Sequence, residues 1–533
     1  MARIIRERTS GDTISVIGHK MKIKVIDLFA GPGGLGEGFA SYRDGSVFSI
    51  AASAEMESSA HATLTLRAFY RTARGDEKAM KAYYDYCNYD GAPHPRTICK
   101  SAWQTACNEA LQLELGKSDQ NNFLDAVLER QCLNEDQTLL IGGPPCQAYS
   151  LVGRSRNQGL KGYVPEQDPR HYLYQEYLRI VHKYKPAAFV MENVKGILSS
   201  SVGGKRVFHG ILKDLADPGR AVGQSSGVKY RIHSLVEPVF FESGQDPAKF
   251  NSQKFVIRAE QHGIPQARHR VILFGVREDI PVEKTGLLPF GESVFIEDAI
   301  SDLPKLRSRL SKGDSAAGWR QSVLLQAAEL IGSASIYKDG KLCRARDEME
   351  KARSGLIDTD FYGALRQVKP AIAGDQEQTG YRAWVEDPRL EVILNHEARG
   401  HMDSDLGRYF YAAAYARGNN ASPKGHEEFS LPGLAPRHAN WESGKFKDRF
   451  RVQVEGRPST TITSHIAKDG HYFIHYDPEQ CRSLTVREAA RLQSFPDNYF
   501  FQGNRTEQYH QVGNAVPSYL ASQIAHVVNQ VFS

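Results

Sequence analysis

The sequence predicts an α/β fold in which a doubly wound, mostly parallel sheet is followed by a second, irregular domain. Two observations predict it. Short apolar runs alternate with helical patterns over the first half of the chain, and this rhythm stops beyond about residue 280. Because 533 residues are also too many for one ordinary domain, we expect at least two.

Four short apolar runs have the length and the bounding turns of buried parallel strands. Between the second and the third, residues 172–184 place five apolar or aromatic side chains on one face of a helix. Strands and helices that alternate in this way indicate a parallel sheet. The four runs are Lys22–Ala30, Thr138–Ile141, Ala187–Glu192 and Arg270–Val276.

The rest of the chain is less regular. From about Ile280 to Arg457, glycine, proline, asparagine and serine interrupt the sequence, and no long periodicity is present. Regular structure returns at Thr485, where TVRE forms a capping box, and a last helix is expected over Ser518–Phe532. We therefore expect four parts: an α/β domain at residues 1–280, a helical surface elaboration inserted into it at 67–116, a second domain at 281–482, and a hinge with the C-terminal helix at 483–533.

The composition excludes several classes of protein. Hydrophobic residues at 41% and charged residues at 24% are typical of a globular chain, and no run of about 20 apolar residues predicts a membrane span. Seven scattered cysteines without a CxxC pair favour neither a disulfide framework nor a zinc site, so a reduced cytoplasmic setting is expected. A net charge of +5 is compatible with a nucleic-acid partner but does not establish one.

A glycine-rich loop follows the first predicted strand and reads DLFAGPGGLG from Asp27. Glycines at the carboxyl end of a strand let the backbone turn tightly and approach a ligand. Gly31, Gly33 and Gly36 also match GxGxxG, so a fold that binds a nicotinamide or flavin dinucleotide is an alternative interpretation of this loop. Glu55 ends the next apolar run and could hold a pair of ribose hydroxyls under either interpretation.

The second motif, GGPPCQAYS, begins at Gly142 and places Cys146 on a stiff loop at the end of a strand. Open α/β sheets place their chemistry there, and a thiolate is a strong nucleophile. Glu192 ends the next strand in the motif MENV. A carboxyl group beside a thiolate in an apolar cleft should have a raised pKa and could donate a proton to a ring nitrogen.

Two further motifs complete the set. In QARHR, alternation along a strand puts Arg268 and Arg270 on the same side, where one or both could meet an anion or the substrate. In QVGNAVP, a polar turn with Asn514 precedes the last helix.

Together and in this order, these five motifs resemble the DNA (cytosine-5) methyltransferase family, of the bacterial restriction-modification or Dcm-like type. The resemblance covers roughly Val25–Val276 and Arg482–Ala525, and the family keeps its variable target-recognition domain between them. It implies a Rossmann-like fold that uses S-adenosyl-L-methionine. The implied cofactor contacts are Asp27, Phe29, Gly31, Gly33, Glu55, Met56, Pro145 and Asn514. The residues implied around the target cytosine are Cys146, Glu192, Arg268 and Arg270.

The activity implied is transfer of a methyl group from S-adenosyl-L-methionine to carbon 5 of a flipped cytosine in a specific duplex DNA sequence. A covalent adduct with Cys146 would activate the ring, Glu192 would act on ring nitrogen 3, and Arg268 would help to hold the base. No metal is expected. Duplex DNA is the expected partner of a monomeric, nucleoid-associated enzyme, and a cognate restriction endonuclease could act separately.

Three other functions stay open: an RNA cytosine methyltransferase with the same catalytic set, a non-catalytic DNA-binding regulator, and a dinucleotide oxidoreductase. The long segment from Ile280 to Arg457 favours duplex DNA, and its loops Asn395–His401 and Arg437–Arg451 are expected to reach base edges. The acidic residue expected to contact adenine has no clear position, and Asp119 is one candidate.

Overall fold

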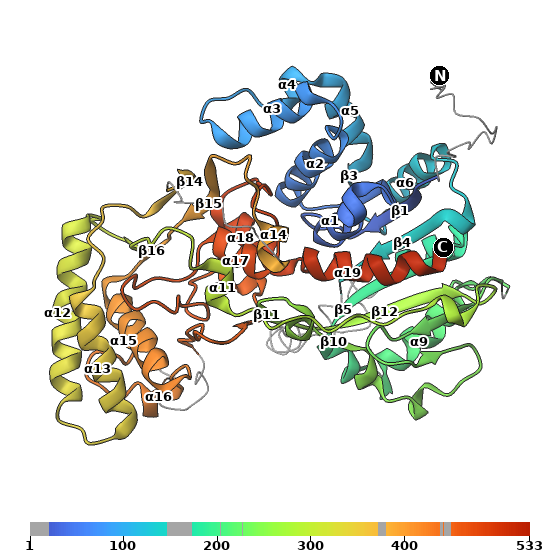
Figure 1. Ribbon diagram of the computed structural model, residues 1–533. Helices are drawn as coiled ribbons and strands as arrows, with labels where there is room; N and C mark the ends of the chain where they lie inside the picture. Colours follow the sequence, from blue (N-terminus) through green and yellow to red (C-terminus); the bar gives the residue numbers. More distant parts are fainter. Residues whose placement is uncertain are drawn as a thin grey trace, which may run out of the picture.

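The computed structural model describes residues 21–145, 173–202, 204–225, 227–370, 380–436, 441 and 449–533. Figure 1 shows two lobes joined at the centre of the molecule. We call the lobe built on the large sheet the α/β lobe, which holds the described residues up to about 280 and the C-terminal helix. The second lobe holds most of residues 281–482.

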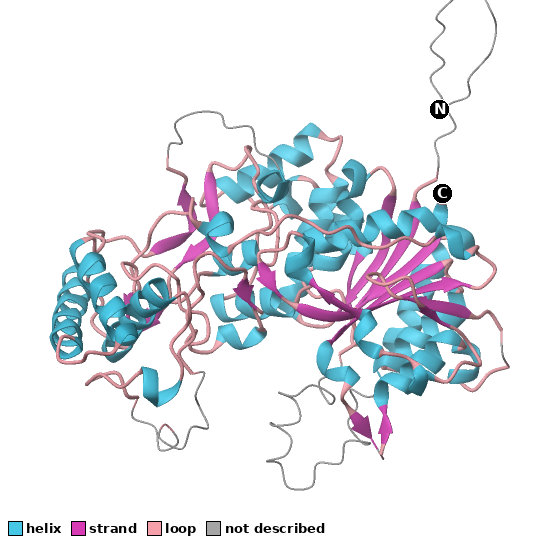
Figure 2. Ribbon diagram, turned by 60° about the horizontal axis from the view of Figure 1, so that its bottom comes forward, coloured by secondary structure: helices cyan, strands magenta, loops and turns pink. Residues whose placement is uncertain are grey.

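The α/β lobe is built on a nine-stranded sheet with the order β3-β2-β1-β4-β5-β12-β8-β9, in which β10 pairs with β12. Figure 2 shows its strands fanned by the sheet's twist. Its strands are β1 (Ile23–Leu28), β2 (Phe48–Glu55), β3 (Ala110–Gln112), β4 (Thr138–Gly142), β5 (Ala188–Val194), β8 (Tyr230–His233), β9 (Phe240–Phe241), β10 (Val256–Arg258) and β12 (His269–Arg277).

Three of the four predicted strands pair in parallel, and the fourth does not. Strands β1, β4 and β5 are parallel neighbours, whereas β12, predicted to be parallel, lies antiparallel between β5 and β8. The reason lies in the connections. The chain from β5 returns through helices to β8, which leaves a gap in the sheet, and the hairpin-like β10–β12 unit fills that gap from the opposite direction.

Helices cover both faces of the sheet, which explains the apolar runs on the strands. On one face, α1 (Gly34–Ser41) and α19 (Ser518–Asn529) pack against Val25 and its neighbours. On the other, Ile26 packs in the core formed with α6 (Ser118–Arg130), α8 (Leu173–Tyr184) and α9 (Val207–Ala216). The predicted last helix therefore returns to the first one (Figure 1).

The predicted insertion is helical, but it is more than a surface elaboration. Its elements are α2 (Ser58–Thr72), α3 (Glu77–Asn88), α4 (Pro95–Ile98) and α5 (Lys100–Glu109). Apolar side chains of α2, α3 and α5 share one core with Leu390, Val392 and Leu394 of the second lobe and with Phe500. The insertion thus connects the two lobes at the top of Figure 1.

The second lobe contains three long helices that the sequence pattern did not predict: α12 (Ala316–Ala334), α13 (Gly340–Ser354) and α15 (Asp403–Asn419). They pack together in one core. Helix α15 is buried from Asp405 through Ala416, so it has no apolar stripe set against a polar face. Periodicity finds half-buried helices, and a helix buried on all sides escapes it.

The two lobes meet around α17 (Val486–Leu492), which opens with the predicted capping box between Thr485 and Glu488.

Within the described residues, no helix is long and apolar enough to cross a membrane. The remaining elements are β6 (Ser201–Val202), β7 (Lys205–Arg206), α10 (Pro218–Ala221), β11 (Gln266–Ala267), α11 (Ile296–Ile300), β13 (Arg309–Leu310), β14 (Gly363–Val368), α14 (Gly380–Val385), β15 (Val392–Glu397), β16 (Gly400–His401), α16 (Gly425–Glu428), β17 (Ser459–Thr460) and α18 (Arg505–Asn514).

Candidate active site

Three of the predicted motifs leave neighbouring strands at one edge of the sheet. Leu28 at the end of β1 lies opposite Gly142 at the end of β4, and Gly142 lies opposite Met191 in β5. The glycine loop, the GGPP loop and the MENV segment therefore start side by side. This is the edge at which open α/β sheets place their ligands.

The glycine loop has a backbone that needs glycine at defined positions. Phe29, Gly31 and Gly33 have φ angles of 58°, 58° and 97°. A Cβ atom at Gly33 would come within 2.8 Å of Leu64 Cδ1, whereas no atom of the described residues lies within 4 Å of the Cβ position of Gly31. A non-glycine residue in the left-handed region, such as Phe29, is strained and often marks a ligand site. The loop is thus packed beneath Gly33 and open above Gly31.

Glu55 ties this loop to the end of β2. Its Oε2 accepts a hydrogen bond of 2.8 Å from the Gly31 amide, and its Oε1 accepts one of 2.8 Å from the Glu57 amide. Burial raises the pKa of Glu55, and these backbone hydrogen bonds oppose the shift. Met56 follows with its side chain 62% exposed. Glu55 is therefore held at the loop, while Met56 lies at the rim of the lobe.

Asp27 lies beneath the loop rather than within it. Its carboxyl group is buried, and no described group donates a hydrogen bond to either oxygen. A Cβ atom at Gly36 would lie 2.6 Å from Asp27 Oδ2, so glycine is required above it. Burial raises the pKa of Asp27 to about 8, which keeps most of this carboxyl neutral at pH 7.

The turn that carries Asn514 reaches the glycine loop from the other end of the chain. A Cβ atom at Gly34 would lie 2.5 Å from the Val516 carbonyl oxygen, so the turn rests directly on the start of α1. Asn514 itself ends α18 and is exposed. The structure thus brings the glycine loop, Glu55 and the Asn514 turn together.

Glu192 and Arg270 form an ion pair in the middle of the same edge. Arg270 Nε lies 2.9 Å from Glu192 Oε1, and the two side chains are 13% and 14% exposed. A Cβ atom at Gly143 would lie 3.1 Å from Glu192 Oε2, so the carboxylate also touches the GGPP loop. Pro145 is partly buried at the end of the described part of that loop, and Cys146 lies outside the described residues. Arg270 therefore holds the Glu192 side chain at this edge.

Arg268, which the sequence predicts on the same side as Arg270, has other hydrogen-bond partners. Its side chain is buried, donating a hydrogen bond of 2.7 Å to the Ile462 carbonyl and one of 3.4 Å to the Gly513 carbonyl. Burial lowers its pKa well below the usual value. Arg268 therefore links the catalytic edge to the second lobe and to the Asn514 turn, and Arg270 alone of the two pairs with Glu192.

Asp119 follows the end of β3 and stays a candidate for the adenine contact. It lies in the first turn of α6 and accepts a hydrogen bond of 3.0 Å from Gln120. The residue paired with Glu55 at the edge of the sheet is Gln112, at the end of β3. Sequence analysis missed it because β3 is only three residues long and follows the insertion directly. The short alternating run ALQLEL is the signal that could have found it.

Most of the segment Asn395–His401, expected to reach base edges, is buried, although Glu397 is partly exposed and Gly400 is exposed. Two of its polar side chains donate to main-chain carbonyls. Asn395 Nδ2 donates to the Phe501 carbonyl, and Arg399 donates to the carbonyls of Ile466 and Lys468. These two side chains are used by buried carbonyls, which need donors, and the reach of this segment to base edges stays a prediction. Of the second expected loop, residues 437–440 and 442–448 lie outside the described residues.

Comparisons with known proteins agree with this geometry. The chain matches a family model described as C-5 cytosine-specific DNA methylase over residues 96–231 and 246–530. It is 33% identical over 531 residues to the type II methyltransferase M.Bpa9945I of Bacillus paralicheniformis, covering 96% of this chain and 99% of that one. It is 24% identical to the type II methyltransferase M.AgeI of Thalassovita gelatinovora, covering 96% and 100% of the two chains.

Among solved structures, a DNA modification methyltransferase encoded in an E. coli prophage is similar in fold. The TM-score is 0.51 at 18% identity, and the match covers 96% of this chain and 99% of that one.

Proposed function

The chain belongs to the C-5 cytosine-specific DNA methylase family, and from that premise we propose that Cys146, Glu192 and Arg270 form its catalytic site. The enzyme transfers a methyl group from S-adenosyl-L-methionine to carbon 5 of a flipped cytosine in DNA, through a covalent cysteine adduct. What remains to be assigned is which residues of this chain do each part of the work.

The residues around the glycine loop fit the cofactor. An adenosyl group with hydroxyls and a charged tail suits three features of this site. They are the space that the described residues leave above Gly31, the Glu55 carboxylate fixed by two backbone amides, and the adjoining Asn514 turn. When bound, S-adenosyl-L-methionine supplies a methyl group on a positively charged sulfur. We propose that Glu55 accepts hydrogen bonds from the ribose and that Phe29, Gly31, Gly33 and Asn514 line the site.

The other three predicted cofactor residues receive different roles. Met56 lies exposed beside Glu55, where its side chain can cover the bound adenine. Pro145 stiffens the backbone that leads to Cys146. Buried Asp27 supports the glycine loop from below.

The catalytic residues act on the cytosine ring. The Cys146 thiolate adds to carbon 6, which makes carbon 5 nucleophilic, and Glu192 bonds ring nitrogen 3 to stabilise the adduct. Arg270 holds Glu192 in place through its 2.9 Å contact. After transfer, carbon 5 loses its proton, the electron pair reforms the 5,6 double bond, and the thiolate leaves. Arg268 keeps the strand that carries Arg270 attached to the second lobe.

A single observation supports this assignment most strongly. Glu192 lies between Arg270 and the Gly143 backbone, and Gly143 is three residues before Cys146 in the chain. The test is a duplex with 5-fluorocytosine at the target, because fluorine cannot leave carbon 5 as a cation. We expect a denaturant-stable complex with the wild type and none with Cys146→Ala. Cys481→Ala, which also removes one thiol, is the control. An equal yield of complex from Cys146→Ala would place the nucleophile elsewhere.

The substrate and partners follow from the same reasoning at coarser detail. The family acts on DNA, and we propose that the second lobe is the target-recognition domain for a specific duplex sequence, within the division 1–280, 281–482 and 483–533. Because the relatives are named type II methyltransferases, we propose a separately acting restriction endonuclease as companion to a monomeric, cytoplasmic enzyme. Turnover on duplex DNA and on transfer RNA, compared side by side, tests the choice of nucleic acid.

A further inference from the structure

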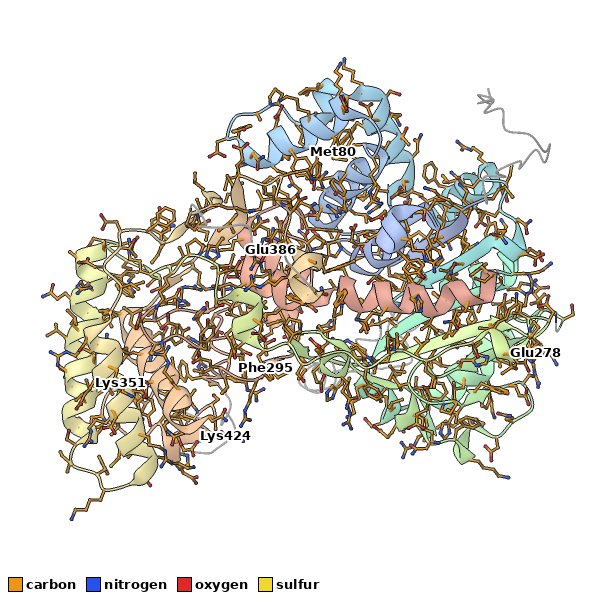
Figure 3. All side chains as sticks on the ribbon, viewed as in Figure 1. Met80, Glu278, Phe295, Lys351, Glu386 and Lys424 are labelled. Carbon is orange, nitrogen blue, oxygen red and sulfur yellow. The ribbon has the colours of Figure 1, made fainter. Side chains whose placement is uncertain are left out.

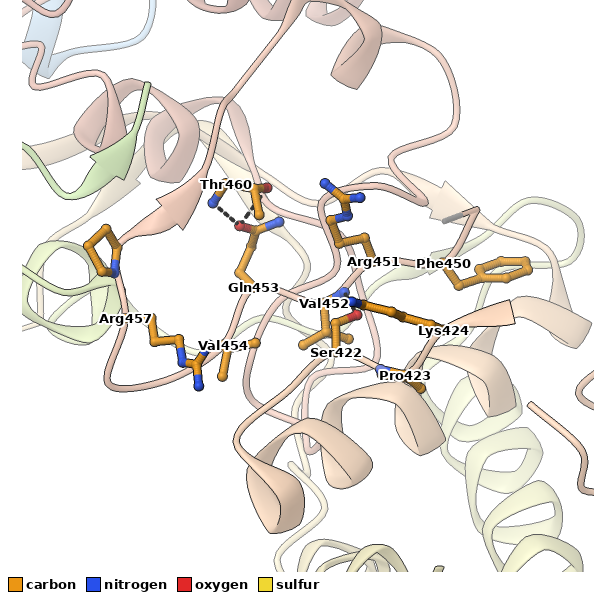
Figure 4. Close-up of a pocket in the computed structure, with 11 residues that line it drawn as sticks. Ser422, Pro423, Lys424, Phe450, Arg451, Val452, Gln453, Val454, Arg457 and Thr460 are labelled. Atoms are coloured by element: carbon orange, nitrogen blue, oxygen red, sulfur yellow. Dashed lines mark hydrogen bonds between the residues drawn. The ribbon is translucent and has the colours of Figure 1, made fainter. Parts of the chain in front are cut away.

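A basic pocket of about 340 Å³ opens on the second lobe (Figure 4). Three cations line it: Lys424, Arg451 and Arg457. No carboxylate occurs among the described residues of its lining, which are otherwise apolar, amide or hydroxyl side chains. A concave site whose described lining carries positive charge and no carboxylate attracts an anion.

Two of these cations, Lys424 and Arg457, are exposed and form no ion pair with a described carboxylate. Lys424 is exposed, and no described carboxylate lies within ion-pair distance of its ammonium group. Arg457 is exposed and donates to a neutral acceptor, Asn420 Oδ1, at 3.1 Å. The nearest acid along the chain, Glu455, pairs with Arg417 instead. Both exposed cations can therefore meet a ligand without breaking an ion pair among the described residues.

The floor of the pocket is fixed by hydrogen bonds. Gln453 Oε1 accepts from the Thr460 amide at 2.8 Å and from its hydroxyl at 3.1 Å, as Figure 4 shows. Ser422 Oγ accepts from the Val452 amide at 3.1 Å. A site that is already ordered loses little entropy when it takes up a ligand.

The pocket is next to the catalytic edge. Thr460 pairs with Ala267 in the two-stranded sheet of β17 and β11, and Thr461 Oγ1 donates to the Ala267 carbonyl at 2.6 Å. Arg270, the partner of Glu192, follows three residues later. Figure 3 places Lys424 on the lower edge of the second lobe, on the side turned toward the α/β lobe.

We propose that this pocket holds a backbone phosphate of the substrate duplex, close to the flipped cytosine. The proposal rests on the proposed function, because it assumes that Glu192 and Arg270 mark the position of the target base. Three extended residues span roughly 10 Å, and phosphates on one strand rise about 3.4 Å per nucleotide. The phosphate therefore belongs to a nucleotide about three positions from the target. Such a contact anchors the duplex without reading sequence.

The experiment combines protein variants with neutralised phosphates. The double variant Lys424→Ala/Arg457→Ala is compared with the wild type for binding to cognate and non-cognate duplexes across a salt series. Lys78→Ala is the control, because it removes an exposed charge on α3, far from the pocket. A set of duplexes then carries one methylphosphonate each, at successive positions from the target cytosine. Cofactor binding reports that each variant is folded.

We expect the double variant to bind both duplexes about tenfold or more weakly at low salt, with a salt slope smaller by roughly 0.9 for each phosphate that is no longer neutralised. One methylphosphonate near the target should weaken wild-type binding and leave the double variant unchanged, which identifies the phosphate in the pocket. The Lys78→Ala slope should equal that of the wild type.

Several results would overturn the proposal. One is a double variant with wild-type affinity and slope on DNA that the wild type methylates, which leaves the catalytic assignment untouched. A second is weaker binding of the cognate duplex alone, which would make these residues base readers. A third is competition by inorganic phosphate at the pocket with no change in duplex binding. If the wild type methylated no duplex at all, the pocket proposal would fail together with the proposed function.

Discussion

The two lobes use the same residue types in opposite ways. In the α/β lobe, polar residues at strand ends, such as Glu55, Glu192 and Arg270, are partly exposed and converge on one edge. In the second lobe, Asn395 and Arg399 are buried and bond main-chain carbonyls. A regular sheet satisfies its own carbonyls and leaves strand-end side chains free for chemistry, whereas an irregular backbone must take its donors from side chains.

Glu192→Gln is the strongest test on the α/β side of this comparison. It should slow methyl transfer by about 10²–10⁴-fold, since the amide cannot give a proton to ring nitrogen 3. Cofactor affinity should change little, because Glu55 and the glycine loop remain. Single-turnover transfer and cofactor titration separate the two effects. A collapse of cofactor affinity would show that Glu192 has a structural role like the arginines of the second lobe.

Arg268→Met tests the boundary between the two lobes. It leaves the Ile462 and Gly513 carbonyls without a donor, and we expect a loss of about 2–4 kcal/mol in the free energy of unfolding. Arg270→Met should keep most of the stability and lose methyl transfer instead. Urea midpoints and transfer rates measured on both variants give the contrast. A stable but inactive Arg268→Met would move Arg268 into the catalytic set.

The acid stability of the second lobe offers a third test, through His396. Burial lowers its pKa to about 4, while an unfolded histidine protonates near its ordinary value of 6.5. The unfolded state therefore takes up a proton first, and stability falls as the pH drops from about 6.5 to 4.

His396→Gln should reduce the dependence of the free energy of unfolding on pH by up to about 1.4 kcal/mol per pH unit, which corresponds to the uptake of one proton. Exposed His510→Gln is the matched control and should leave the slope unchanged. Urea unfolding at a series of pH values measures both. Identical slopes for His396→Gln and the wild type would mean that His396 is not kept neutral by the fold.

The smallest effect concerns the insertion. Arg366 of β14 donates to the Tyr86 and Cys87 carbonyls of α3, so Arg366→Met should cost about 1–2 kcal/mol. Arg346→Met, which breaks an exposed pair with Asp347 on α13, should cost less than about 0.5 kcal/mol. Thermal unfolding of both variants compares the two losses. If both variants lost the same stability, the contacts between the insertion and the second lobe would contribute no more than an exposed ion pair, as expected of a surface elaboration.

The features that the sequence predicts depend on local pattern, and those that it misses depend on contacts between distant segments or on burial from all sides. Strand ends, the capping box at Thr485 and the last helix could be predicted because each depends on local pattern or backbone geometry. The different fates of Arg268 and Arg270 could not, since both contacts join segments far apart in the chain. Helix α15, buried on all sides, also lacked a periodic signal, and the three-residue β3 offered only the short alternating run that ends at Leu115.

The return of α19 to α1 has a consequence for biosynthesis. The Asn514 turn rests on Gly34, yet the whole second lobe is translated between Val276 and that turn. At about 5–20 residues per second, a ribosome needs roughly 10–50 s to cross this interval. Because the cofactor site that we propose includes this turn, a chain that ends before it lacks part of the site. We therefore expect prematurely terminated chains to leave the cell's DNA unmodified.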